Sequence, residues 1–176
     1  MKNAYAFNMV LLMLRLGVGA VMLAHGINHI FGGGKIEGTG RWFASLGVKP
    51  GRLHAWLASI TEIIGGVLLL LGLLMPLGAA AVVGVMLVAW ITNHRGNGFF
   101  IFRPGEGWEY VMILTLTGVA LGVLGAGEWS LDHHLGIFDP PGAEGLLIVL
   151  AAGGGGALAL LALCWRPPAK DPKPAP

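Results

Sequence analysis

The chain has 176 residues, of which 55% are hydrophobic and only 11% are charged. Because a soluble domain carries about 25% charged residues, this composition excludes an ordinary soluble protein and predicts an integral membrane protein. The formal net charge of +2 is too small to indicate a nucleic-acid partner, and the single cysteine, Cys164, excludes an intrachain disulfide or a CxxC redox pair.

The first apolar stretch, residues 9–31, is long enough to cross a hydrocarbon core of about 30 Å as a helix. It nevertheless contains Arg15, His25 and His29, which together with Met22 follow one another at helical spacing and share one face. Polar side chains in a membrane helix turn away from lipid, so we expect this face to contact other helices. Since no convincing cleavage site follows, we interpret the stretch as a retained helix and not as a signal peptide.

Four further apolar stretches predict membrane helices, at residues 53–75, 77–94, 109–126 and 144–165. The second and third stretches have almost no loop between them, so we expect a tight antiparallel hairpin that breaks at Pro76. The last stretch contains four consecutive glycines, residues 153–156, which membrane helices tolerate better than soluble helices do.

The charges of the connecting segments predict how the chain is oriented in the membrane. Nine basic residues lie on one side, in the first loop, the third loop and the tail: Lys35, Arg41, Lys49, Arg52, Arg95, Arg103, Arg166, Lys170 and Lys173. The other side has Lys2 alone, and the fourth loop is acidic, with Glu128, Asp132, Asp139 and Glu144. The positive-inside rule then predicts an external N-terminus and a cytoplasmic C-terminus. The glycine- and aromatic-rich first loop is expected to lie at the interface, over the helix ends.

Ionisable side chains from four predicted helices fall in the same half of the membrane: His25, His29, Glu62, His94 and Glu109. Arg15 lies deeper, and its pairing with Glu62 would neutralise a buried charge without any chemistry. His94 and Glu109 are equally compatible with water-exposed positions at the interface. His25 and His29 have the i, i+4 spacing of a helical metal site, but hydrogen-bonded core histidines explain that spacing as well.

Short motifs occur in a characteristic order along residues 9–135: Arg15-Leu16-x-x-Gly19, His25-Gly26-x-x-His29-x-Phe31-Gly32, Phe43-x-x-Leu46-Gly47, Glu62-x-x-Gly65-Gly66, Gly72-Leu73, Asn97-Gly98-Phe99-Phe100, Gly107-Trp108-Glu109-Tyr110 and Ser130-Leu131-Asp132. Their combination resembles the DoxX family of bacterial membrane proteins. The resemblance implies a relationship to the DoxD subunit of thiosulfate:quinone oxidoreductase, and to membrane oxidoreductase complexes that handle thiols and oxidative stress. The family usually has lysine at the position of His29, where this chain has a titratable imidazole.

The resemblance implies an all-α membrane protein with an antiparallel four-helix transmembrane bundle, to which this chain adds a fifth, C-terminal transmembrane helix. We therefore expect a DoxX-like domain at residues 1–135, the additional helix at residues 136–166 and a proline-rich disordered tail at residues 167–176. The extra helix suits homo-oligomerisation or the docking of a partner.

The first functional hypothesis is a component of a redox system in a bacterial inner membrane, such as an oxidoreductase subunit, that handles quinone or a sulfur or thiol substrate. Glu62, Glu109, His25 and His94 would carry protons, and Arg15 would balance their charge. The chain lacks a flavin or dinucleotide fingerprint and a cysteine motif for iron–sulfur ligation. Any electron carrier beyond quinone would then be a haem, a metal or a redox partner protein.

Two other hypotheses stay open on the sequence alone. One is a non-catalytic membrane anchor or assembly module for a partner protein, in which the polar cluster is structural. The other is a module that binds a transition metal or haem through His25, His29 and His94 with a carboxylate. The family motifs add Asn97 and Trp108 as candidate cofactor-binding residues.

Overall fold

The computed structural model of the protein describes residues 2–137 and 140–168, and all regular elements in that part of the chain are helices. They are α1 (Lys2–Phe31), α2 (Lys35–Ser45), α3 (Gly51–Leu71), α4 (Met75–Ala89), the π-helix η1 (Trp90–His94), α5 (Glu109–Leu124), α6 (Leu131–Leu135), α7 (Ala143–Ile148), the π-helix η2 (Val149–Gly154) and α8 (Gly155–Cys164). The predicted all-helical class is confirmed. Asp139, Lys170, Lys173 and most of the predicted disordered tail lie outside the described residues.

Within the described ranges, four helices are long and apolar enough to cross a membrane: Asn3–Phe31, Gly51–Leu71, Met75–His94 and Ala143–Cys164. The last of these combines α7, η2 and α8 into one continuous helix, which we call the C-terminal helix. The helix α5 is also apolar but has 16 residues, so its spanning of the membrane stays a prediction. Large apolar side chains point outward from the helices, as lipid contact requires; Met13, Ile64, Leu116 and Leu158 are all more than half exposed.

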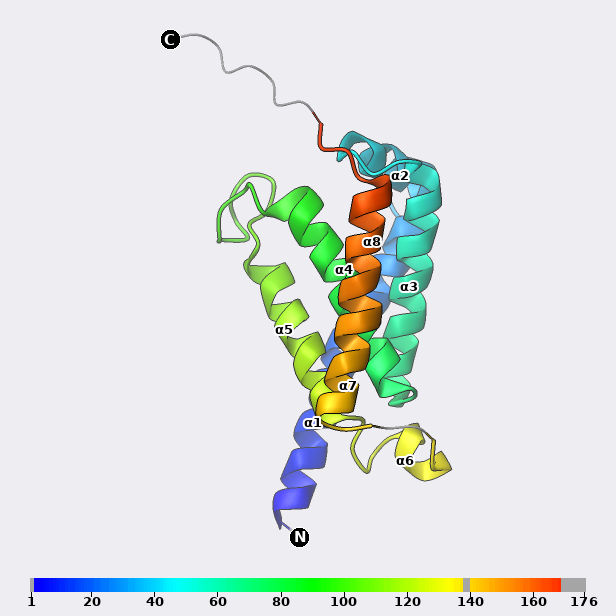
Figure 1. The fold of residues 1–176 in the computed structure, drawn as a ribbon, viewed down its shortest axis with the longest axis vertical. Helices are drawn as coiled ribbons and strands as arrows, with labels where there is room; N and C mark the ends of the chain where they lie inside the picture. Colours follow the sequence, from blue (N-terminus) through cyan, green and yellow to red (C-terminus); the bar gives the residue numbers. More distant parts are fainter. Residues whose placement is uncertain (1, 138–139, 169–176) are drawn as a thin grey trace.

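Helix packing places the core around α4. The helix α1 packs along α3, and α4 contacts α3, α5 and the C-terminal helix. The buried core between them is formed by apolar side chains of several helices, among them Leu11, Met22, Leu69, Val82 and Leu121. Figure 1 shows the long helices running along the long axis of the molecule, with α2 at one end and α6 at the other.

The predicted break near Pro76 is confirmed at the turn between α3 and α4. The helix α3 ends at Leu71 and is capped by Gly72, whose left-handed backbone (φ 61°) a side chain would strain. The helix α4 begins at Met75, so Pro76 stands in its first turn, where a missing N–H leaves no helical hydrogen bond unmade.

The first loop contains a helix that the sequence analysis did not predict. The helix α2 packs against α3 and α1 and buries Ile36. The segment after α2 pairs with the end of the C-terminal helix: Lys49 N–H donates to the Cys164 carbonyl at 2.9 Å, and Trp165 Nε1 donates to the Leu46 carbonyl at 3.0 Å. This pairing fixes the C-terminal helix beside α2 and the start of α3.

A cavity with a histidine–glutamate pair

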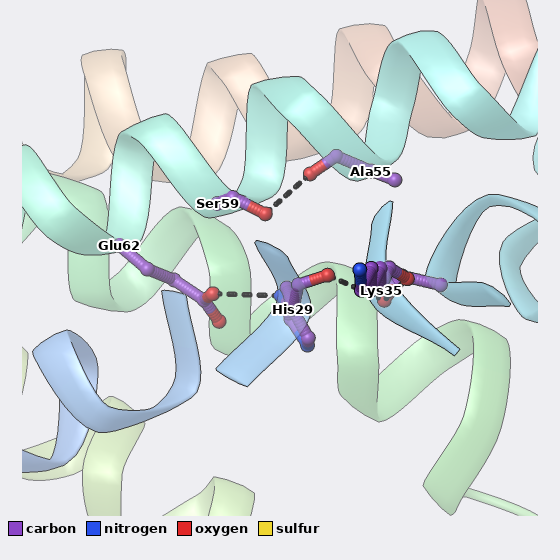
Figure 2. A network of polar contacts seen from close by, with 6 residues as sticks. His29, Lys35, Ala55, Ser59 and Glu62 are labelled. Atoms are coloured by element: carbon purple, nitrogen blue, oxygen red, sulfur yellow. Dashed lines mark hydrogen bonds and ion pairs between the residues drawn. The ribbon is translucent and has the colours of Figure 1, made fainter. Parts of the chain in front are cut away.

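The helix pair α1–α3 brings together two of the predicted site residues. His29 lies near the end of α1, and its Nδ1 is 3.0 Å from Oε2 of Glu62 on α3 (Figure 2). The side chains are 15% and 4% exposed, respectively, so the pair is largely removed from solvent. Buried charged or polar groups are stable only when they are paired, and this contact gives each group a partner.

The surrounding helices hold His29 in position. The Thr39 hydroxyl of α2 donates a hydrogen bond to the carbonyl oxygen of His29 at 3.0 Å and so connects α2 to the last turn of α1. One turn before Glu62, the Ser59 hydroxyl donates to the Ala55 carbonyl at 2.7 Å and so needs no partner from α1 (Figure 2). The Ser59 hydroxyl therefore does not hydrogen-bond to His29, whose Nδ1 contacts Glu62.

The pair stands in the wall of a cavity of about 580 Å³, a volume typical of sites for small organic ligands. Most of the lining is apolar and comes from α3, α4 and the C-terminal helix. The ionisable side chains of the lining are His25, His29, His54, Glu62, His94, Glu106 and Tyr110. Four of the five residues predicted to cluster thus share one cavity, and the fifth, Glu109, is not in its lining.

His54 and Tyr110 belong to the site, although the sequence analysis did not propose them. His54 on α3 is 5% exposed, and neither of its ring nitrogens has a hydrogen-bond partner. The ring of Tyr110, in the first turn of α5, is 6.4 Å from that of His25. The sequence could have pointed to His54, because it lies eight residues before Glu62 and this spacing places both residues on the same side of a helix.

His94 reaches the cavity at the end of a π-helical turn. It is the last residue of η1 and is buried, with Nδ1 3.0 Å from the Glu106 carbonyl oxygen and Nε2 3.3 Å from Asn93 Nδ2. A π-turn widens the helix and is frequent at functional sites. Here it continues α4 and places Asn93 and His94 in the cavity lining.

Arg15 is buried elsewhere, and the suggested pairing with Glu62 is wrong. Its Nη2 donates to the Trp129 carbonyl at 2.6 Å, and its guanidinium lies against Gly72. Gly72 follows Glu62 by ten residues, which is about 15 Å along α3. Arg15 therefore lies beside the C-terminal end of α3, away from Glu62, and Glu62 pairs with His29 instead.

Comparison with known protein families matches the first part of the chain, which contributes many of the cavity residues. The DoxX family model matches residues 10–95. The chain belongs to the DoxX family. The matched segment runs from α1 to η1 and carries His25, His29, His54, Glu62 and His94, whereas α5 and the C-terminal helix, which also line the cavity, follow it. Comparisons with curated proteins and with solved structures found no match.

Three residues proposed for the DoxX site instead support the loop after η1. The Asn97 amide donates to the carbonyl oxygens of Asn93, Gly105 and Glu106. Glu109 accepts a hydrogen bond from the Ile101 N–H at 2.7 Å, and Trp108 stacks on Trp90 with ring centroids 5.5 Å apart. None of the three is part of the cavity lining.

The geometry also bears on the metal hypothesis for this DoxX protein. No group of three His, Cys, Asp or Glu side chains in the described part of the chain is placed to hold a metal ion. The rings of His25 and His29 lie 6.5 Å apart, edge to face. A metal shared by His25, His29 and His94 therefore has no support in their arrangement.

Proposed function

We propose that this DoxX-family membrane protein binds a quinone in the cavity and acts as the quinone-handling component of a membrane redox system. The observation that carries the proposal is the His29–Glu62 pair in the wall of an otherwise mainly apolar cavity. A quinone has an apolar ring with carbonyl oxygens at its edge, so it needs apolar walls and a few well-placed polar groups.

The His29–Glu62 pair suits proton exchange with such a ring. Reduction of a quinone to a quinol takes up two electrons and two protons, and oxidation releases them. Because Nδ1 of His29 contacts Glu62, Nε2 is the ring atom left for a ligand. The protonated imidazole donates one proton at Nε2 to a quinone oxygen, or the neutral imidazole accepts one from a quinol, while Glu62 stabilises the charged ring. The second proton is exchanged by the other ionisable side chains of the lining.

The electrons come from outside the chain in this proposal. Sulfur or thiol substrates are electron donors of suitable chemistry, delivered directly or through a redox partner protein. Arg15 and Glu109 have structural contacts away from the cavity, so we assign proton exchange to His29 and Glu62, with His25, His94 and Tyr110 beside them.

We further propose that the protein crosses a bacterial inner membrane with alternating helix directions, including α5 and the C-terminal helix. The basic residues of the first loop, the third loop and the tail support a cytoplasmic position for these segments and an external N-terminus. In this orientation the cavity's polar side chains lie in the cytoplasmic half of the membrane.

Quinone binding by variants tests this function. Quenching of intrinsic tryptophan fluorescence by decylubiquinone reports binding to protein in lipid nanodiscs, since Trp42 lines the cavity. We expect Glu62→Gln and His29→Ala each to weaken binding by about tenfold, because each change breaks the close His29–Glu62 pair that orients Nε2 toward the ligand. The control is Glu37→Gln, because Glu37 is exposed, lies on α2 and pairs with Arg52 at 3.3 Å outside the cavity lining.

Unchanged affinity in both cavity variants would contradict the proposal. So would a wild-type protein that binds no quinone while a stoichiometric partner protein carries all the redox activity. The latter result would favour the anchor or assembly role.

A further inference from the structure

One face of α4 and η1 lines the cavity along nearly its whole length. Leu77, Ala81, Gly84, Val88 and Thr92 follow one another at steps of three or four residues and all belong to the lining. The fifteen residue-to-residue steps from Leu77 to Thr92 correspond to about 22 Å at a rise of 1.5 Å per step. The cavity is therefore a long furrow on α4, longer than a single ring requires.

The polar side chains of this furrow are grouped at one of its two ends. Its polar side chains come from the end of α1, the first part of α3, η1, the following loop and the start of α5. From Gly84 toward Leu77 the lining is apolar. A furrow with polar groups at one end and apolar walls at the other matches an amphiphile, with its head at the polar end.

The furrow opens sideways between α3 and the C-terminal helix. Leu57 of α3 and Leu77 of α4 line the cavity and are each 47% exposed. Ala152 and Gly156 of the C-terminal helix are also exposed lining residues. Figure 1 shows α4 passing behind α8, with α3 beside it. Because α3 and the C-terminal helix are both apolar enough to span a membrane, this opening faces lipid.

We infer that the furrow holds the isoprenoid tail of a lipid-soluble quinone, which enters from the bilayer between α3 and the C-terminal helix. The inference rests on the proposed quinone function and specifies its substrate class: a long-tailed membrane quinone, not a water-soluble one. The ring lies at His29 and Glu62, and the buried, unpartnered imidazole of His54 in the same wall is a further polar group for it.

The glycine run of the C-terminal helix has two roles in this arrangement. A Cβ on Gly153 would lie 2.6 Å from the Ala80 carbonyl oxygen, so Gly153 permits close packing on α4. A Cβ on Gly156 would meet no atom within 4 Å, although Gly156 lines the cavity. Gly156 therefore keeps the side opening wide.

A paired glycine substitution tests the inference in the full chain, reconstituted in lipid nanodiscs. Gly156→Leu places a side chain in the opening, whereas the control Gly155→Leu places one at an exposed position outside the lining. Both changes replace a helical glycine with a better helix former, so we expect both proteins to fold. The probes are decylubiquinone and its tailless dimethoxy-methyl-benzoquinone head group.

We expect Gly156→Leu to weaken decylubiquinone binding by about tenfold or more, since buried tail methylenes contribute to affinity, and to change head-group affinity by less than about twofold. Gly155→Leu should change neither affinity. Ala152→Phe, at the same opening, gives a second variant with the same expected pattern.

Three results would overturn the inference. In the first, Gly156→Leu and Ala152→Phe both bind decylubiquinone as tightly as the wild type. In the second, the wild type binds the tailless head group as tightly as decylubiquinone, which leaves the quinone function intact and removes the tail site. In the third, the wild type binds neither probe, and then the proposed function fails together with the inference.

Discussion

At the scale of single residues, two arrangements of buried polar side chains in the cavity wall differ in their contacts. His29 and Glu62 have each other as partners in a place where neither is well exposed. By contrast, His54 is buried with two unpartnered ring nitrogens. The His29–Glu62 contact supports the fold as well as the proposed chemistry. The unpartnered His54 lowers stability, and a ligand that hydrogen-bonds to its ring would offset this cost.

Removing one partner of the His29–Glu62 pair should cost more than removing both. We expect His29→Ala to lower the free energy of unfolding by about 3 kcal/mol, because Glu62 loses its partner in a buried site. The double variant His29→Leu/Glu62→Leu should be more stable than His29→Ala. Thermal unfolding in mild detergent, followed by circular dichroism, measures both, with the exposed His25→Ala as control. A His29→Ala protein as stable as the wild type would show that the pair contributes nothing to the fold.

Replacing His54 should affect the ligand-free protein very little. Its ring nitrogens make no hydrogen bond, so we expect His54→Phe to leave the free energy of unfolding unchanged or raise it by up to about 1 kcal/mol. Ser59→Ala on the same helix loses a buried hydrogen bond and should cost about 1 kcal/mol. The same unfolding assay compares the two. If His54→Phe were the more destabilising change, His54 would have a structural partner.

The sequence pointed to several of these side chains because ionisable residues are rare in membrane helices. His25, His29, Glu62 and His94 were identified on that basis, and all four line the cavity. Their pairing was beyond prediction. Arg15 was assigned to Glu62 by charge alone, but the packing of α1 on α3 places Arg15 beside Gly72. The charges in the sequence do not reveal how far along α3 a residue of α1 lies.

At the scale of elements, the start of α4 depends on a residue far away in the chain. Both carboxylate oxygens of Asp132 accept backbone hydrogen bonds, from Leu74 at 2.7 Å and from Met75 at 2.9 Å. Asp132 is fully buried and lies in the short helix α6. It therefore caps α4 from outside, satisfies N–H groups that the helix leaves free and places negative charge at its N-terminus.

Loss of this cap should destabilise the turn between α3 and α4. We expect Asp132→Ala to lower the free energy of unfolding by about 2 kcal/mol, the upper range for an N-terminal cap, because the freed N–H groups are buried. His134→Ala, at an exposed position of the same short helix, should have little effect. Chemical unfolding in detergent reports the difference. Equal stabilities of the two variants would exclude a capping role.

Hydropathy predicted the apolar helices, because length and apolar composition are local properties. The largest boundary error is at α1, which begins at Lys2, whereas the apolar stretch was taken to begin at residue 9. Hydropathy did not predict α2, since this helix has polar and glycine residues and depends on packing against α3. The same limit applies to the loop after η1. Asn97, Trp108 and Glu109 belonged to recognisable motifs, but only the fold shows that their contacts hold the loop itself.

At the scale of the whole molecule, the family match and the cavity have different extents. The DoxX match ends at residue 95, next to His94, whereas the cavity also requires Tyr110 and the C-terminal helix. The helix beyond the expected four-helix domain was predicted as an oligomerisation or docking element. In the structure it packs on α4 and forms one side of the cavity opening.

The orientation of the molecule can be tested with single introduced cysteines, because the chain has only one native cysteine to remove. In a Cys164→Ser background, single cysteines introduced at Asn3 and at Lys35 should label from opposite sides of sealed membrane vesicles. We expect a membrane-impermeant maleimide to reach the Asn3→Cys site from outside and the Lys35→Cys site from the cytoplasmic side. Labelling of both sites from one side would contradict the proposed topology.

The most direct test of quinone binding is photo-crosslinking with an azido-quinone, followed by peptide mapping of the labelled full-length protein. We expect labelling on the cavity faces of α3 and α4, close to Glu62 and Gly84, and loss of that labelling when excess decylubiquinone competes. Labelling confined to the outer surface of the helices, or insensitive to competing quinone, would contradict a quinone site in this cavity.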